Sequence, residues 1–410
     1  MKKIAHYALL LLIIAGWVRC TEPYEHEVDD FENVLVIQGM ITNQPGPYRV
    51  KISRTMGLSE KHPEAYRETG AVVTISDEKG NFETLTEKAP GIYQTDPNGI
   101  QGNIGHEYVL TVYTADGSNY ESEPVTLTKG PDIDAINPRA VEYYSVERNK
   151  KIKGVDINVS TESWEKGQEL YFRWDFEETW EMDPLWSQIS LDKLYEIYEK
   201  GDYRQSIPTP GNRKSYNEPE DTANCWNTLY SDNIVIHASS ELNTQKIEQH
   251  TLLHLDEYNA KPVFGYSLNV RQYIVNKAVY DFWKMLKNNT QDNGSIFDNI
   301  PYNVQGNIYS CENTSQEVFG YFDACYVSEK RVHYKSPIEG VEFFNKMENC
   351  ITDTINWNDF LFDSEFRQFP REAVHVVSYN AYGPFYTNQT WCVTCREYAS
   401  DVNKPDFWIY

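Results

Sequence analysis

The sequence lacks several features that would assign it to a common class of protein. After residue 20 it has no run of about 20 apolar residues, the length that a membrane-spanning helix needs. It also lacks GxSxG, a P-loop, a GxGxxG after a strand, and HExxH. We therefore expect no catalytic residue, bound metal or cofactor, and a protein that is not an enzyme. A surface hydrolase is the third-ranked alternative, because no nucleophile–base set emerges. With 61 acids in the chain, no single pair of carboxylates points to glycoside cleavage.

Basic side chains are also scarce. Lys and Arg number 37 against 61 acids, which gives a net charge of −24. Such a surface repels phosphates, so no nucleic acid is expected as a partner. Aromatic side chains are plentiful, with 30 Tyr and 10 Trp, and they suit binding surfaces as well as cores. A chain of 410 residues is longer than the length at which a single hydrophobic core stops growing, which predicts two domains.

The N-terminus indicates export. Two lysines precede an apolar run from Ile4 to Val18, which predicts a signal peptide over residues 1–19. The run ends at Cys20 and resembles a lipoprotein signal, in which the cysteine sulfur receives a lipid. Arg19 departs from the Gly, Ala or Ser usual before that cysteine, so ordinary cleavage that leaves Cys20 as a thiol is the alternative.

Residues 20–32 are rich in Asp and Glu, which indicates an extended, hydrated tether. This segment is similar to the acidic signal that sends Bacteroidota lipoproteins to the outer face of the outer membrane. We therefore expect a lipid anchor in the outer membrane and exposure to the cell exterior. A plain solvated linker is the simpler interpretation of the same composition.

The fold class predicted is mainly β. Short alternating segments separated by turn residues predict an immunoglobulin-like β-sandwich over residues 33–130. The expected strands lie at 34–37, 48–53, 71–76, 82–86, 92–93, 108–114 and 120–127. Gly and Pro at 130–131 and Asn and Pro at 137–138 mark a boundary.

A larger β-rich domain with a few helices is expected over residues 138–410. Alternation at 155–159 and 170–177 predicts strands, and further strands are expected at 318–327 and 373–378. One apolar stripe at helical spacing, Ile274 to Leu286, predicts a helix that packs on a sheet.

An insertion at residues 180–222 is the best candidate for a binding element. It interrupts the alternation and is rich in acids and large aromatics, namely Trp180, Trp186, Tyr195, Tyr198 and Tyr203. Aromatic rings on loops stack on sugars or anchor protein partners. We therefore predict an exposed element, with a short helix at 191–203, that contacts a partner or ligand. A small core under a long loop is the alternative.

Six further cysteines are candidates for disulfides, because an even number in an exported chain favours pairing. They are Cys225, Cys311, Cys325, Cys350, Cys392 and Cys395. Cys311 and Cys325 flank a turn-like stretch and could close a local loop. The CxxC at 392–395 is compatible with a redox motif, half a zinc site or a structural bridge, and the bridge is favoured because no second ligand pair lies nearby.

Two weaker patterns complete the list of candidate sites. His250 and His254 are four residues apart and would share a face of a helix or a strand, but two ligands do not make a metal site. Thr222 and Thr354 each follow an Asp and resemble the O-glycosylation site of Bacteroidota proteins.

Several motifs in order resemble one family. They are Cys20 with its acidic tether, VLVIQGMIT at 34–42, GPY at 46–48, GAVVTI at 70–75, PGIY at 90–93, NCW at 224–226, GNI at 306–308, GYF at 320–322 and the CxxC followed by KPDFW at 404–408. Together they are similar to the Bacteroidota lipoproteins filed as domain of unknown function 4249, over nearly the whole mature chain. The sequence departs at 398–400, where Tyr-Ala-Ser replaces an expected glycine pair.

That resemblance implies an outer-membrane lipoprotein, often encoded beside a TonB-dependent receptor, and it implies no catalytic residues. The leading hypothesis is a non-catalytic subunit that captures a ligand for such a receptor or covers its mouth. The alternative is a free-standing adhesin or glycan-binding protein on the cell surface. A glycan or a peptide is the ligand class expected in either case.

Overall fold

The computed structural model describes residues 34–55, 66–182, 191–201, 225–290, 306–313, 315–343, 353–362, 375–379, 384–387, 399–400 and 403–409. The signal peptide, Cys20 and the tether lie outside these ranges. The predicted fold class is confirmed, since strands arranged in several sheets dominate and helices are few. Among the described residues, no helix is both long and apolar enough to cross a membrane.

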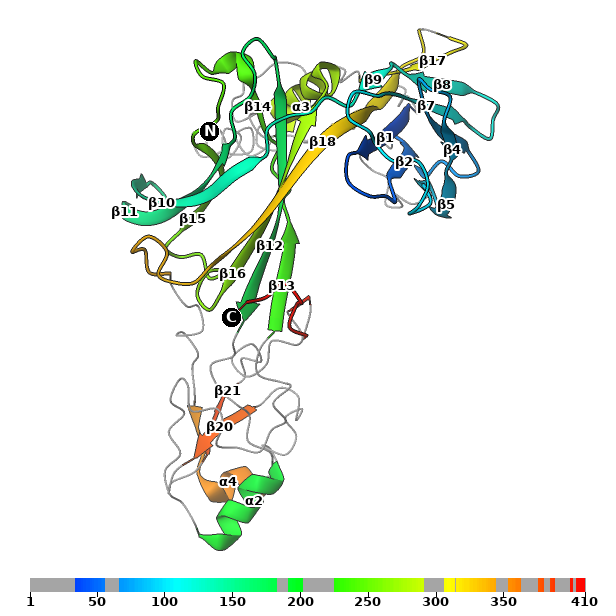
Figure 1. The fold of residues 1–410 in the computed structure, drawn as a ribbon. Coiled ribbons are helices and arrows are strands. Elements are labelled where there is room, and N and C mark those ends of the chain that lie inside the picture. The colour runs from blue at the N-terminus through cyan, green and yellow to red at the C-terminus, as the bar shows by residue number, and fades with distance from the viewer. Residues whose placement is uncertain are drawn as a thin grey trace, which may run out of the picture.

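Two facing sheets form the N-terminal sandwich, the lobe at the right of Figure 1. One layer contains β1 (Leu35–Thr42), β2 (Arg49–Arg54), β5 (Thr86–Ala89) and β6 (Ile92–Gln94). The other contains β3 (Val72–Asp77), β4 (Phe82–Thr84), β7 (Glu107–Tyr113), β8 (Asn119–Ser122) and β9 (Val125–Thr126). Alternate residues of both layers, such as Ile37, Ile75 and Leu110, are buried in one core.

Two strands from late in the chain complete this sandwich. β17 (Ile308–Ser310) pairs with β8 and extends the second layer. β18 (Val318–Tyr334) lies parallel to β1, in register from Leu35 opposite Val318 to Thr42 opposite Cys325. Residues 33–130 alone therefore do not contain all the strands of the sandwich.

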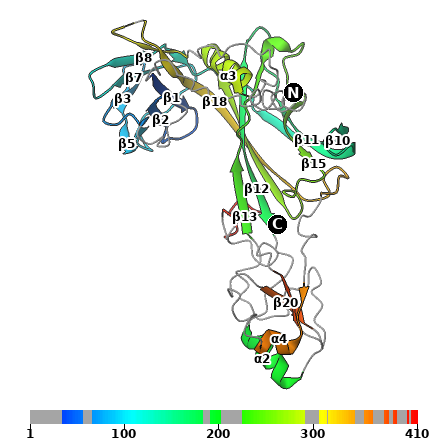
Figure 2. The same cartoon turned by 180° about the vertical axis from the view of Figure 1, so that it is seen from behind.

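The second half of β18 belongs to a second β-sandwich. There the sheet continues through β16 (Tyr266–Val275) and β12 (Tyr171–Met182) to β13 (Cys225–Tyr230), with β14 (Val235–Ala238) also on β12. A sheet of β10 (Ile133–Ser145), β11 (Lys150–Thr161) and β15 (His250–Asp256) covers one face. Phe172, Trp174 and Phe176 fill the space between the two sheets, as their alternation predicts. Figure 2, the view from behind, shows β18 running from one sandwich into the other.

The nine-stranded sheet that runs from β13 through β18 to β5 is called the long sheet. One helix, α3 (Lys277–Thr290), packs on its other face. The predicted helix began at Ile274, but Ile274 and Val275 are the last residues of β16. Both are buried there, so their apolar character serves the strand, while Val279 and Phe282 supply the buried side of the helix.

A third, smaller lobe lies below the second sandwich in Figure 1. Its described parts are α2 (Leu191–Lys200), β19 (Asp353–Thr354), α4 (Trp357–Phe362), β20 (His375–Tyr379) and β21 (Pro384–Thr387). β21 pairs with both β19 and β20. The strand predicted at 373–378 corresponds to β20.

Candidate functional site

The aromatic residues predicted for binding that the structure describes lie on two separate elements, β12 and α2. Trp180 lies within β12 opposite Tyr266, so the sheet continues to Met182 and the insertion starts later than expected. Its ring is packed against the core, with the Lys261 ammonium 5.0 Å from the ring centre. Tyr195 and Tyr198 lie on α2, and the Tyr198 ring is 5.8 Å from that of Trp357 on α4. Trp186 and Tyr203 lie outside the described residues.

The expectation of disulfides is correct for one described cysteine and wrong for two. Cys225 is disulfide-bonded. Cys311 is free and exposed, and Cys325 is free and buried. Cys325 cannot close a local loop with Cys311 because its thiol points into the core and donates a hydrogen bond to Asp323 at 3.1 Å. Cys350, Cys392 and Cys395 lie outside the described residues.

The two spaced histidines lie on β15, but they do not share a face. A bulge at Leu252 shifts the register between β15 and β11 and reverses the alternation. His250 points inward and stacks on Trp174 at 4.7 Å, whereas the ring of His254 lies 2.8 Å from the Asp156 carboxylate near the surface. Within the described ranges, no group of three or more His, Cys, Asp or Glu side chains could hold a metal ion.

The two predicted glycosylation sites remain predictions. Thr354 lies in β19 and is exposed, as a modified hydroxyl would have to be. Thr222 lies outside the described residues.

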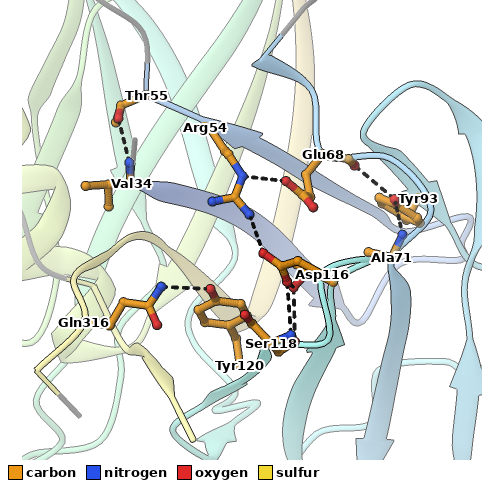
Figure 3. Close-up of polar contacts among 11 residues, drawn as sticks. Val34, Arg54, Thr55, Glu68, Ala71, Tyr93, Asp116, Ser118, Tyr120 and Gln316 are labelled. Atoms are coloured by element: carbon orange, nitrogen blue, oxygen red, sulfur yellow. Dashed lines mark hydrogen bonds and ion pairs between the residues drawn. The ribbon is translucent and has the colours of Figure 1, made fainter. Parts of the chain in front are cut away.

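A charged cluster at the end of the first sandwich is structural. Figure 3 shows Arg54 between Glu68, at 2.6 Å, and Asp116, at 3.4 Å. The Asp116 carboxylate also accepts hydrogen bonds from the Thr114 hydroxyl and the Ser118 amide. These bonds, with the nearby Arg54 charge, lower the pKa of Asp116 to about 2. The cluster fixes the β7–β8 hairpin to β2.

A second charged cluster crosses the face of the long sheet below α3. Arg271 donates to Asp175 at 2.8 Å, and Arg331 donates to Glu177 at 2.8 Å. Because the strands alternate, these side chains all stand on the face opposite the core formed by Trp174 and its neighbours. Each charge is partly buried and paired, so the cluster supplies cohesion across three strands rather than a reactive group.

The outer face of the six-stranded sheet exposes four large apolar side chains. Phe82 is 72% exposed, Val72 52%, Tyr113 49% and Tyr309 41%. The pairing register places all four on one face, with Val72 directly opposite Tyr113. We call this surface the outer face. Sequence analysis missed it, although apolar residues at the outward positions of alternating strands were a usable signal.

A cleft lies where β18 passes from the first sandwich to the second. Its volume is about 380 Å³, and it is lined by Asn43, Gln44, Asp132, Ile133 and residues 326–330. Asp132 accepts a hydrogen bond from the Tyr326 hydroxyl at 2.7 Å, and the Ser328 hydroxyl accepts one from the amide of Ile133 at 3.0 Å. We call this site the junction cleft. Sequence analysis missed it because its walls come from segments far apart in the chain.

Two β-sandwiches that share a strand, with an exposed apolar sheet face and a cleft at their junction, define a multi-lobed, mainly β protein. The chain belongs to the family described as Domain of unknown function (DUF4249), which matches residues 21–331. The resemblance seen in the sequence is thus confirmed. No curated protein matches the sequence.

Proposed function

We propose that the protein is a non-catalytic lipoprotein of the outer membrane that serves as an accessory ligand-capture or lid subunit of a TonB-dependent receptor. The signal peptide, Cys20 and the acidic tether support the location. The outer face supports a binding role, because large apolar side chains that stand together on a surface favour contact with a partner.

Membrane attachment is tested by Cys20→Ala. The variant should move from the membrane fraction to soluble fractions, because it loses the only lipid attachment proposed. Retention of the variant in the membrane would count against the anchor.

The partner is tested by extracting the full-length lipidated protein from membranes with mild detergent and identifying what co-purifies. A large β-barrel receptor should be recovered with the wild type. A Tyr113→Ser, Val72→Thr double variant removes apolar area from the outer face. It should recover at least fivefold less receptor than the wild type. Tyr144→Ser, which changes a tyrosine of similar exposure on β10 outside the outer face, is the matched control. The absence of any barrel protein with the wild type would refute the receptor assignment.

A glycan-binding function is the second candidate, and one detail of the outer face favours it. Asn119 and Glu121 stand between Tyr113 and Tyr309, so two rings flank an amide and a carboxylate. Rings and planar polar groups together suit sugar recognition. Binding on a glycan array that is lost in Tyr309→Ala, but kept in Phe82→Ala, would establish this function.

A further inference from the structure

The long strand β18 changes its neighbours halfway along its length. Residues 318–325 pair with β1, and this pairing ends at Thr42 opposite Cys325. Residues 326–334 pair with β16, starting at Tyr326 opposite Ile274. β1 and β16 lie on opposite sides of β18. Among the described strands, none therefore continues along the β1 side of β18 beyond Cys325.

The side chain of Asn43 shows which way the backbone of this edge points. Its Oδ1 accepts a hydrogen bond from the Val327 amide at 2.6 Å, and its Nδ2 donates to the Val327 carbonyl at 3.2 Å. Alternate residues of a strand direct their amide and carbonyl groups to the same edge, and the register with β16 is unbroken here. The backbone groups of Glu329 and Arg331 therefore point out of the open edge. In the described chain, no hydrogen bond reaches them.

Among the described residues, no hydrogen-bonded strand closes this edge beyond Val327, and the Phe407 ring packs on the Arg331 guanidinium at 3.6 Å. Val327 is only 5% exposed, whereas Glu329 is exposed to solvent. Proteins usually shield such an edge with a lysine, a proline, a bulge or a covering segment. Here the Lys330 ammonium is turned onto the Asp134 carbonyl, at 2.5 Å. The side chains of Glu329 and Arg331 bind Asn269 and Glu177 on the sheet face instead of standing over the edge.

We propose that the β18 edge beside the junction cleft binds an extended segment of a protein partner, which adds to the sheet as a strand next to β18. The segment would continue the line of β1 over positions 328–332, a length of roughly 16 Å at the usual rise per residue. Main-chain hydrogen bonds to Glu329 and Arg331 would hold it, and the cleft would receive a side chain.

The charges near the edge define the chemistry of that segment. Asp132 and Glu329 are the two acids among the residues that line the cleft, and Glu329 is exposed. The one lysine lining the cleft, Lys330, already donates to the Asp134 carbonyl. A segment with Lys or Arg alternating with β-branched apolar residues is complementary to this lining. The identification of the receptor as the source of this segment rests on the proposed function.

The probe for this site is an acetylated, amidated seven-residue peptide that alternates Val and Lys. Its matched control carries N-methyl groups on alternate amides, which removes the strand-forming donors and leaves the side chains unchanged. The first peptide should bind at least tenfold more tightly. It should also slow hydrogen exchange of the Glu329 and Arg331 amides at least tenfold. Equal binding of both peptides, or protection elsewhere, would overturn the proposal.

The matched variants are Glu329→Pro and Glu329→Gln. Proline removes one outward amide and keeps the ladder to β16, because proline is tolerated where the missing amide faces out of an edge. Peptide binding should fall at least tenfold in Glu329→Pro and less than twofold in Glu329→Gln. Undiminished binding by a folded Glu329→Pro would overturn the site. If that variant does not fold, the exchange measurement on the wild type decides.

The same variants separate this site from the proposed function. Loss of peptide binding by Glu329→Pro with full receptor recovery would show that the receptor docks elsewhere, which overturns the receptor as occupant. If the peptide binds but no receptor co-purifies with the wild type, the site is supported and the proposed role as a receptor subunit is refuted.

Discussion

At the scale of single residues, buried polar groups hold the region where β18 meets α3. The Asp323 carboxylate is fully buried and accepts hydrogen bonds from the amides of Asn276 and Ala324 and from the Cys325 thiol. Burial raises the pKa of Asp323 and that of Cys325. Because these groups satisfy one another, they are structural. Counting cysteines could not reveal this, since a count carries no information on burial.

His250 should make the stability of the protein depend on pH. Burial, with the neighbouring charges of His237 and Lys287, lowers the pKa of His250 to about 4, against about 6.5 in an unfolded chain. As pH falls from 6.5 to 4, the unfolded chain binds a proton that the folded chain does not. Stability should therefore fall through this window by up to about 3 kcal/mol.

The variant His250→Phe keeps a ring against Trp174 and removes the titrating group. Urea unfolding at pH 7 and pH 4.5 should show a smaller loss of stability in the variant than in the wild type. An equal loss in both proteins would show that other groups carry the dependence.

Asn43 should contribute more to stability than its neighbour Gln44. Asn43→Ala removes both hydrogen bonds to the Val327 backbone and should lower the free energy of unfolding by about 1–3 kcal/mol. Gln44→Ala removes one longer bond to the same carbonyl, at 3.3 Å, and should cost less than about 1 kcal/mol. Urea unfolding at pH 7 measures both changes. Similar losses in the two variants would contradict the role given to Asn43.

At the scale of elements, local signals predicted the strands well and their partners poorly. Alternation at 48–53 and 108–114 corresponds to β2 and β7, and the apolar stripe corresponds to most of α3. The strand expected at 318–327 continues to Tyr334, because its second half pairs with β16. Pairing across nearly the whole chain leaves no local pattern, so neither the junction cleft nor the open edge was predictable.

Gly320 should be essential for the pairing of β1 with β18. Its φ is +99°, and a Cβ atom there would lie 1.8 Å from the Ile37 carbonyl oxygen. Gly320→Ala should therefore cost more than about 3 kcal/mol, the combined effect of strain and displaced strands. Gly80 has a similar φ of +84° but open space around it, so Gly80→Ala should cost only about 1–2 kcal/mol. Thermal unfolding compares the two, and equal costs would mean that the close approach does not matter.

At the scale of the whole molecule, β18 makes one body of the two sandwiches. Its first half completes the first sandwich, and its second half is the edge of the long sheet of the second. The two sandwiches on either side of the sequence boundary near 130–138 therefore share one strand.

The fragment of residues 33–130 should not fold alone. It lacks β17 and β18, so buried residues of β1, such as Leu35 and Ile37, would stand at an open edge. Near-ultraviolet circular dichroism should show no cooperative thermal transition. The same fragment joined by a flexible linker to residues 306–327 should recover one. A cooperative transition in the shorter fragment would contradict the dependence on β18.

The pairing of β1 with β18 also sets an order in time. Asn43 and Val327 are 284 residues apart in the chain. At a synthesis rate of 5–20 residues per second, β1 waits roughly 15–60 s before its partner strand exists. During that interval β1 has β2 on one side but lacks β18 on the other, and contacts at such separation form slowly. Of the described strands, β1 is thus the first to be made, and one of its two edges stays unpaired until β18 has been synthesised.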